Sequence, residues 1–196
     1  MRRLPEKGLI VSCYLDSMCG VEREFIASVC HLPEVVALRI EGLDNIAYAR
    51  RIAPERYIIG LVKFAVSGRT FITPESQFKN IVSAGADMIA TECYYIADDY
   101  PVMWDINWDT ANIKARHLRS DLVLSTTYYH KAFDKLQAWV GEFPNRINFE
   151  GGIETAEEIQ RGFDLGADYV TIGKAINDPP TIIRNLIRGV SINAKI

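Results

Sequence analysis

The chain has 196 residues, of which 48% are hydrophobic and 24% charged, so it is long enough for one large core and too short for two domains of ordinary size. Its net charge of -3 and its scattered basic residues create no positive electrostatic field that would attract nucleic acid or an anionic membrane. These features favour small-molecule chemistry over binding to either of those partners.

The cysteines show no CxxC spacing and no histidine at a zinc-site distance, which predicts reduced thiols in a cytoplasmic protein and no metal site. They are Cys13, Cys19, Cys30 and Cys93. The apolar run after the basic N-terminus is too short for a signal sequence or a membrane span. No linker or change of composition divides the chain, so we expect one domain over residues 1–196.

Short apolar runs alternate with amphipathic segments along the chain, a pattern typical of parallel strands covered on both faces by helices. The expected strands are 9–13, 35–40, 57–63, 87–91, 102–106, 122–126, 146–150 and 169–172. The expected helices are 43–52, 74–83, 110–118, 132–140, 155–165 and 180–187. A near-repeat, Gly85-Ala86-Asp87 and Gly166-Ala167-Asp168, ends a helix with glycine twice and leads into a strand each time.

Eight strands in this alternation predict a (β/α)8 TIM barrel. Residues 92–101 are too few for a helix that crosses back over the barrel, so the helix between strands 4 and 5 should be missing or very short. Trp104 is out of phase with the inward Asp105 and should cover the vacant outer face. A doubly wound sheet is the alternative, but the first strand is not followed by its glycine fingerprint.

Charged side chains fall on the inward phase at the carboxyl ends of four strands, where barrel enzymes carry their chemistry. They are Arg39, Lys63, Asp105 and Glu150. Charges that converge over an apolar barrel destabilise the folded protein unless they are paired with opposite charges or serve in catalysis or binding. Any one of them could be part of a solvated ion pair at the rim, whereas the four together favour an active site.

Glu150 ends an apolar strand and is followed by Gly151 and Gly152, which allow a tight turn and the close approach of a substrate. The alternative is an acid that only stabilises the positive end of the next helix. His130, after the sixth strand, is interpreted as a surface histidine at a helix start rather than a substrate contact. Several aromatic residues could form a sugar-stacking wall or cover the missing helix: Tyr94, Tyr95, Tyr100, Trp104 and Trp108. If they stay exposed they predict a homodimer.

Nine segments, in the same order and spacing, resemble the N-acetylmannosamine-6-phosphate 2-epimerases of bacterial sialic acid catabolism. They are GLIVSC (8–13), ALRIEG (37–42), IIGLVK (58–63), FITP (71–74), AGADMIA (84–90), MWDIN (103–107), STT (125–127), EGGI (150–153) and IGKAI (172–176). The resemblance runs almost from end to end. It implies a barrel enzyme that interconverts N-acetylmannosamine 6-phosphate and N-acetylglucosamine 6-phosphate without a cofactor or a metal.

The resemblance also implies roles for individual residues. Lys63 and Glu150 would be the catalytic pair, with Arg39 and Asp105 positioning the substrate. The other expected substrate contacts are Ser12, Tyr14, Thr127, Gly151, Gly152, Gly173 and Lys174. Inversion of a carbon next to a carbonyl requires a base, an acid and a group that stabilises the enolate. Whether one residue moves the proton both ways or two divide the work stays open.

Three positions depart from the family pattern. Tyr14 replaces a glutamine, Gly152 replaces an arginine or lysine, and Asp178 replaces an arginine that helps to hold phosphate. Lys174 could restore that charge, and backbone amides near Gly152 and Gly173 could hold an oxyanion. Two alternatives therefore remain: an epimerase for a different amino sugar, with or without a phosphate, or a barrel that serves as a binding or regulatory protein.

Overall fold

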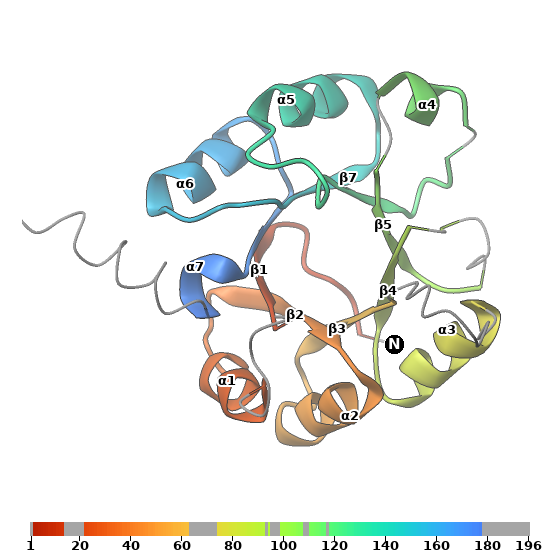
Figure 1. Cartoon of the computed structure of the whole chain (residues 1–196), viewed down its shortest axis with the longest axis vertical. Coiled ribbons are helices and arrows are strands. Elements are labelled where there is room, and N and C mark those ends of the chain that lie inside the picture. Colours follow the sequence, from red (N-terminus) through yellow and green to blue (C-terminus); the bar gives the residue numbers. More distant parts are fainter. Residues whose placement is uncertain are drawn as a thin grey trace, which may run out of the picture.

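The computed structural model describes residues 2–13, 22–62, 74–92, 94, 99–107, 110–116 and 118–177. Its parallel strands form a closed barrel in sequence order, with β1 (Gly8–Ser12) hydrogen-bonded to both β2 (Val35–Glu41) and β8 (Tyr169–Ile172). The helices lie around the barrel, as Figure 1 shows. The predicted TIM-barrel architecture is confirmed, and the doubly wound alternative is excluded.

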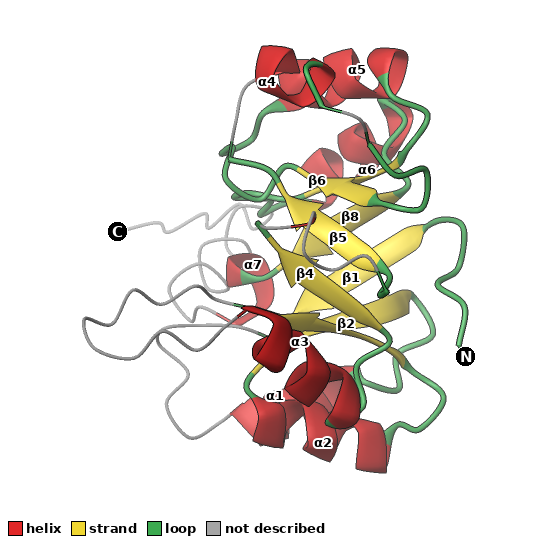
Figure 2. Ribbon diagram, turned by 90° about the vertical axis from the view of Figure 1, so that its right-hand side faces the viewer, coloured by secondary structure: helices red, strands yellow, loops and turns green. Residues whose placement is uncertain are grey.

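The remaining strands differ from the predicted ranges by at most two residues at either end. They are β3 (Tyr57–Leu61), β4 (Met88–Thr91), β5 (Val102–Asp105), β6 (Val123–Ser125) and β7 (Arg146–Phe149). The strands cross the molecule between α1–α3 on one side and α4–α6 on the other (Figure 2). Burial on both faces explains why each strand is a nearly continuous apolar run.

The described helices are α1 (Glu22–Val29), α2 (Leu43–Ile52), α3 (Pro74–Ser83), α4 (Thr110–Lys114), α5 (Phe133–Glu142), α6 (Ala156–Asp164) and α7 (Lys174–Asn177). Helices α2 and α3 have the predicted bounds, and α4 is shorter than predicted. Helix α1 was not predicted; it is short, with eight residues, and buries Ile26 and Val29. The predicted helix 180–187 lies outside the described residues. No helix in the described part of the chain is long and apolar enough to cross a membrane.

The barrel interior is an apolar cluster built from the inward positions of the strands. Ala37, Ile59 and Met103 belong to it, as their phase predicts. Leu4, from the segment before β1, joins the cluster and is only 4% exposed. The Tyr169 hydroxyl donates to the carbonyl of Pro5 at 2.6 Å. The N-terminal segment therefore closes the amino end of the barrel and leaves the carboxyl end for chemistry.

The two aspartates of the near-repeat, Asp87 and Asp168, have the same structural role. Asp87 accepts a hydrogen bond from the backbone N–H of Ile58 at 3.0 Å, and Asp168 accepts one from Ile147 at 2.8 Å. In each case the aspartate N–H donates back to the carbonyl of the same residue. Each aspartate thus fixes the start of the preceding strand at the amino end of the barrel.

The connection between β4 and β5 is covered by aromatic side chains. None of its described residues, 92, 94 and 99–101, forms an α-helix. Trp104 is fully buried, its ring lies 4.3 Å from that of Tyr94, and its Nε1 donates to the carbonyl of Glu92 at 3.0 Å. Trp104 therefore covers the outer face of the barrel as predicted.

Tyr94 is itself only 6% exposed, so this aromatic pair offers no open patch to a second subunit. Tyr95 and Trp108 lie outside the described residues. The homodimer stays a prediction, without support from Trp104 or Tyr94.

Candidate active site

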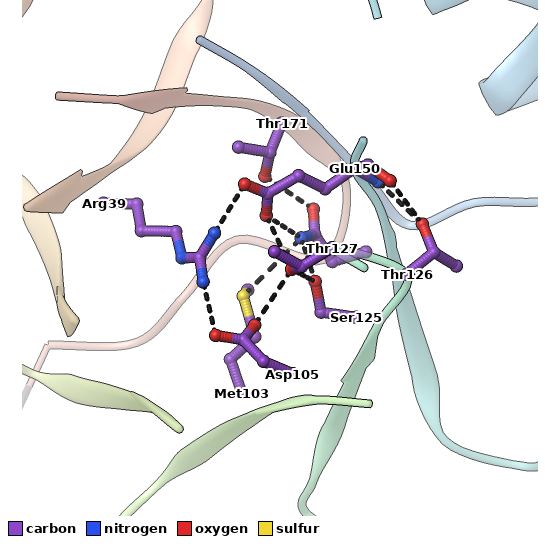
Figure 3. A network of polar contacts seen from close by, with 9 residues as sticks. Arg39, Met103, Asp105, Ser125, Thr126, Thr127, Glu150 and Thr171 are labelled. Carbon is purple, nitrogen blue, oxygen red and sulfur yellow. Dashed lines mark hydrogen bonds and ion pairs between the residues drawn. The ribbon is translucent and has the colours of Figure 1, made fainter. Parts of the chain in front are cut away.

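Arg39 is the centre of a polar network at the carboxyl end of the barrel, drawn in Figure 3. It occupies an inward position of β2 and is only 3% exposed. Its Nη1 donates to Oε1 of Glu150 at 2.5 Å, and its Nη2 pairs with Oδ2 of Asp105. The structure therefore brings together three of the four charges that the sequence places on this edge.

Thr127 connects the same two carboxylates on their other side. Its Oγ1 lies 3.0 Å from Oδ1 of Asp105 and 3.1 Å from Oε2 of Glu150. The side chain of Asp105 is 4% exposed and that of Glu150 is 14% exposed. Glu150 is thus the carboxylate that a ligand above the barrel can reach, and Asp105 lies behind Arg39 and Thr127.

A second layer of polar side chains supports Glu150 from inside the barrel. The Thr171 hydroxyl donates to Oδ1 of Asn148 at 2.7 Å, so the amide nitrogen of Asn148 faces the other way. That nitrogen donates to Oγ of Ser125 at 2.9 Å and to Oε2 of Glu150 at 3.2 Å. The orientation of Asn148 fixes the position of the Glu150 carboxylate.

This second layer was missed among the predicted site residues, although a signal was present. Asn148 stands two residues before Glu150, and Ser125 stands two residues before Thr127, so each lies on the inward face one layer deeper. Both are fully buried. A buried polar residue two positions before a site residue is the pattern that would have identified them.

Thr126 holds the backbone from which Glu150 projects. Its Oγ1 accepts from the N–H of Glu150 at 2.9 Å and donates to the carbonyl of Glu150 at 2.7 Å. The side chain and the backbone of Glu150 are therefore both fixed before any ligand binds. Such pre-organisation is what a proton carrier requires.

The buried charges shift one another's protonation. Burial raises the pKa of Asp105 to about 6; the Arg39 charge lowers it and the Glu150 charge raises it. Burial lowers the pKa of Arg39, but the two carboxylates outweigh it and the net shift is upward. No described residue accepts a hydrogen bond from Nε of Arg39. That buried N–H is a donor without a described acceptor.

Gly151 and Gly152 turn the chain after Glu150 with φ angles of +114° and +74°. A Cβ on Gly151 would lie 2.4 Å from the carbonyl oxygen of Tyr129, and one on Gly152 would lie 2.0 Å from Nδ1 of His130. The imidazole of His130 therefore fills the space beside Gly152, where the family pattern has a long basic side chain. His130 is exposed and precedes α5, as the interpretation of a surface histidine expected.

Ser12 and Gly173 meet where β1 pairs with β8, since a Cβ on Gly173 would lie 3.5 Å from that of Ser12. Lys174 begins α7, is exposed, and forms no ion pair with another described residue. The predicted residues Tyr14, Lys63 and Asp178 lie outside the described residues. Of the predicted catalytic pair, the structure thus describes only Glu150.

Within the described ranges, no group of three or more histidine, cysteine, aspartate or glutamate side chains is placed to hold a metal ion. The Arg39–Asp105–Glu150 group, with its threonine, serine and asparagine partners, is suited to holding and moving protons beside a polar ligand.

No family model matches the chain. A protein of Synechococcus elongatus assigned as an N-acetylmannosamine-6-phosphate 2-epimerase is 30% identical, and the alignment covers 90% of each chain. A relative from Caldanaerobacter subterraneus with the same assignment is 28% identical, and the alignment covers 93% of this chain and 90% of the relative.

Solved structures support the same fold. The N-acetylmannosamine-6-phosphate 2-epimerase of Clostridium perfringens has a TM-score of 0.72 at 22% identity, with 93% of each chain covered. The thiamine phosphate pyrophosphorylase of Pyrococcus furiosus has a TM-score of 0.62 at 11% identity, with 87% of each chain covered, so the barrel alone does not distinguish these activities. The identity and coverage of the Synechococcus relative show that the chain belongs to the N-acetylmannosamine-6-phosphate 2-epimerase family.

Proposed function

We propose that the protein interconverts N-acetylmannosamine 6-phosphate and N-acetylglucosamine 6-phosphate by removing and returning the proton at C2. Family membership supports the substrate and the reaction. The observation that carries the proposal is the fixed Glu150 carboxylate, paired with buried Arg39 at the end of the barrel where such enzymes act.

The chemistry needs the open-chain form of the sugar, in which C2 lies beside a carbonyl. Loss of the C2 proton places negative charge on the carbonyl oxygen, and a nearby N–H donor lowers the energy of that oxyanion. The buried Arg39 guanidinium beside Glu150 would supply positive charge near that oxygen. Glu150 would carry a proton at C2 or assist ring opening, and Lys63 would be the second proton carrier, as the family resemblance implies.

The phosphate is proposed to bind near the start of α7. Lys174 supports this because it is exposed and unpaired among the described residues. The backbone N–H groups of Gly152 and Gly173 would be further donors to the anion. The loss of an arginine at Asp178 makes Lys174 the cation on which phosphate affinity would depend. His130, beside Gly152, would contribute charge only when it is protonated.

The proposal extends to the cellular setting. We infer a single-domain cytoplasmic protein that acts in the sialic acid branch of amino sugar catabolism, as the sequence resemblance indicates. The buried free thiols of Cys13 and Cys30 are in keeping with a reducing compartment. The homodimer is proposed from the sequence alone, and light scattering after gel filtration would test it.

The reaction is tested by incubating the protein with N-acetylmannosamine 6-phosphate in deuterated water and following C2 by NMR. We expect deuterium at C2 together with formation of the gluco epimer. The unphosphorylated sugar should react far more slowly, and Lys174→Ala should raise KM only for the phosphorylated one.

Equal or faster turnover of the unphosphorylated sugar would show that the substrate is a different amino sugar from the one proposed. Binding of either sugar without isotope at C2 would indicate a binding or regulatory protein. Both results would contradict the proposed function.

A further inference from the structure

Three oxygen atoms surround Oγ1 of Thr127 at hydrogen-bond distance. Oγ of Ser125 lies at 2.7 Å, Oδ1 of Asp105 at 3.0 Å, and Oε2 of Glu150 at 3.1 Å (Figure 3). Each of these contacts is favourable only if a proton lies between the two oxygens. Three contacts therefore require three protons.

The two hydroxyl groups supply only two of them. Ser125 accepts from the Asn148 amide, whose orientation is set by Thr171, so its own proton is free to point to Thr127. The single proton of Thr127 can serve one carboxylate and not both. With both carboxylates ionised, one oxygen–oxygen contact of about 3 Å has no proton and is repulsive.

The charges of the group also indicate one additional proton. Among the described residues, Arg39 brings one positive charge against two carboxylates in a group that is almost fully buried, and such an excess of negative charge is costly. One added proton makes this described group neutral. Arg39 already donates to Oδ2 of Asp105 and to Oε1 of Glu150, and the Asn148 amide donates to Oε2 of Glu150. The added proton therefore belongs first on Oδ1 of Asp105, the carboxylate oxygen whose one described hydrogen-bond partner is Thr127.

We propose that Asp105 and Glu150 share one proton through the hydroxyl of Thr127, which makes buried Asp105 the proton reservoir for Glu150. In the transfer, the proton on Oδ1 of Asp105 moves to Oγ1 of Thr127 while the hydroxyl proton of Thr127 moves to Oε2 of Glu150. Asp105 becomes a carboxylate, Glu150 becomes a carboxylic acid, and Thr127 is unchanged. No other reactant is required.

The surroundings of Asp105 favour this role. In the part of the chain that the structure describes, Arg39 from β2 and Glu150 after β7 are the charged groups that contact it or its hydrogen-bond partner Thr127, and burial is the largest cause that raises its pKa to about 6. Glu92 lies at the rim, where it is bonded to Tyr128 and to Asn107. Asp105 itself is 3% exposed, so its proton reaches a ligand through Thr127 and Glu150 rather than through solvent.

The catalytic consequence rests on the proposed function. When Glu150 gives a proton to the substrate, Asp105 would resupply it within the closed site. Thr127 is then a positioning and relay residue whose hydroxyl, and not its shape, is required.

The test compares Thr127→Val, which keeps the shape and removes the hydroxyl, with Thr127→Ser, which keeps the hydroxyl. The first readout is 13C NMR of the side-chain carboxyl carbons as a function of pH, in protein without substrate. In the wild type, the Asp105 signal should titrate near pH 6, and the Glu150 signal should change in the same transition because the two groups share the proton. In Thr127→Val they should separate, and in Thr127→Ser they should move together again.

The second readout is turnover. Thr127→Val should lower kcat about tenfold or more, with KM changed less than about twofold, and Thr127→Ser should recover most of the loss. Independent titration of the two carboxyls in the wild type, or joint titration that survives in a folded Thr127→Val protein, would overturn the proposal. The wild-type titration is decisive even if the valine variant does not fold.

The NMR result does not depend on the reaction. Joint titration without epimerase activity would leave the shared proton in place and contradict only the proposed function. An active enzyme whose carboxyls titrate separately would contradict only the shared proton.

Discussion

The barrel carries a pair of buried or half-buried carboxylates at each end, and the two pairs are treated differently. At the amino end, Asp87 and Asp168 each accept a backbone N–H from the preceding strand, and Asp87 also binds Arg50. At the carboxyl end, Asp105 and Glu150 compete for one guanidinium and one hydroxyl.

The difference lies in the balance of donors and acceptors. Each amino-end carboxylate has a local donor of its own, as expected of a group that only stabilises the fold. At the carboxyl end two carboxylates face one described cation, and a single hydroxyl lies between two of their oxygens, a condition that a fold selected only for stability would avoid. An unbalanced pair of carboxylates therefore marks the site of proton chemistry better than burial alone does.

The largest expected effect is that of Arg39→Met, which keeps the length and apolar character of the stem. It removes the only described cation bonded to Asp105 and Glu150. We expect a loss of about 3–5 kcal/mol in the free energy of unfolding at pH 7, because two carboxylates would be left buried without a partner. Urea denaturation measures it, and the loss should shrink at pH 5 as the carboxylates take up protons.

Glu150→Gln should lower kcat at least about a hundredfold, the scale of a lost acid or base, with a much smaller effect on stability. The amide can still bond Arg39 through its oxygen but cannot carry a proton. Steady-state kinetics with a parallel unfolding curve measure both quantities. Near-normal turnover by the folded variant would remove Glu150 from the catalytic pair.

Asp168→Ala, the matched change at the amino end, should show the opposite pattern. It leaves the N–H of Ile147 without its side-chain acceptor and should cost about 1–3 kcal/mol of stability. Its kcat per folded molecule should equal that of the wild type. A large loss of turnover here would mean that the two ends are not separate in function.

The smallest effect is a pH dependence of stability. Because the pKa of Asp105 rises from 3.8 to about 6, the folded protein keeps a proton that the unfolded chain releases. The stabilisation from this proton is complete below about pH 4 and is lost as the pH rises through 6. Asp105→Asn should remove this slope, as urea midpoints between pH 4 and 7 would show, and an unchanged slope would assign it to another group.

The strands and the charged site residues could be predicted because both follow short-range rules. A strand buried on both faces is a continuous apolar run. A charged residue on the inward phase, such as Arg39, is expected at the carboxyl end of the barrel. The ring of Trp104 was placed correctly by the same phase argument. Thr171 was not recognised as a site residue, because its importance depends on its contact with Asn148 on the neighbouring strand.

Contacts between loops were beyond prediction for a similar reason. Nothing in the spacing of Gly152 and His130 indicates that the imidazole fills the space above the glycine. The bond between Tyr128 and Glu92 joins residues 36 positions apart. Such pairs are set by the path of the backbone, which local patterns do not determine.

The short connection that Trp104 and Tyr94 cover also affects the order of folding. Ile89 pairs with Val102 across a separation of 13 positions, whereas Ile59 and Met88 of the preceding strand pair are 29 apart. Compared with the β3–β4 connection, the shorter β4–β5 connection lowers the entropic free-energy cost of loop closure by about 0.7 kcal/mol. The β4–β5 pair, with its aromatic cover already in place, is therefore the part of the barrel that we expect to form first, and mutations at Trp104 should slow refolding more than they speed unfolding.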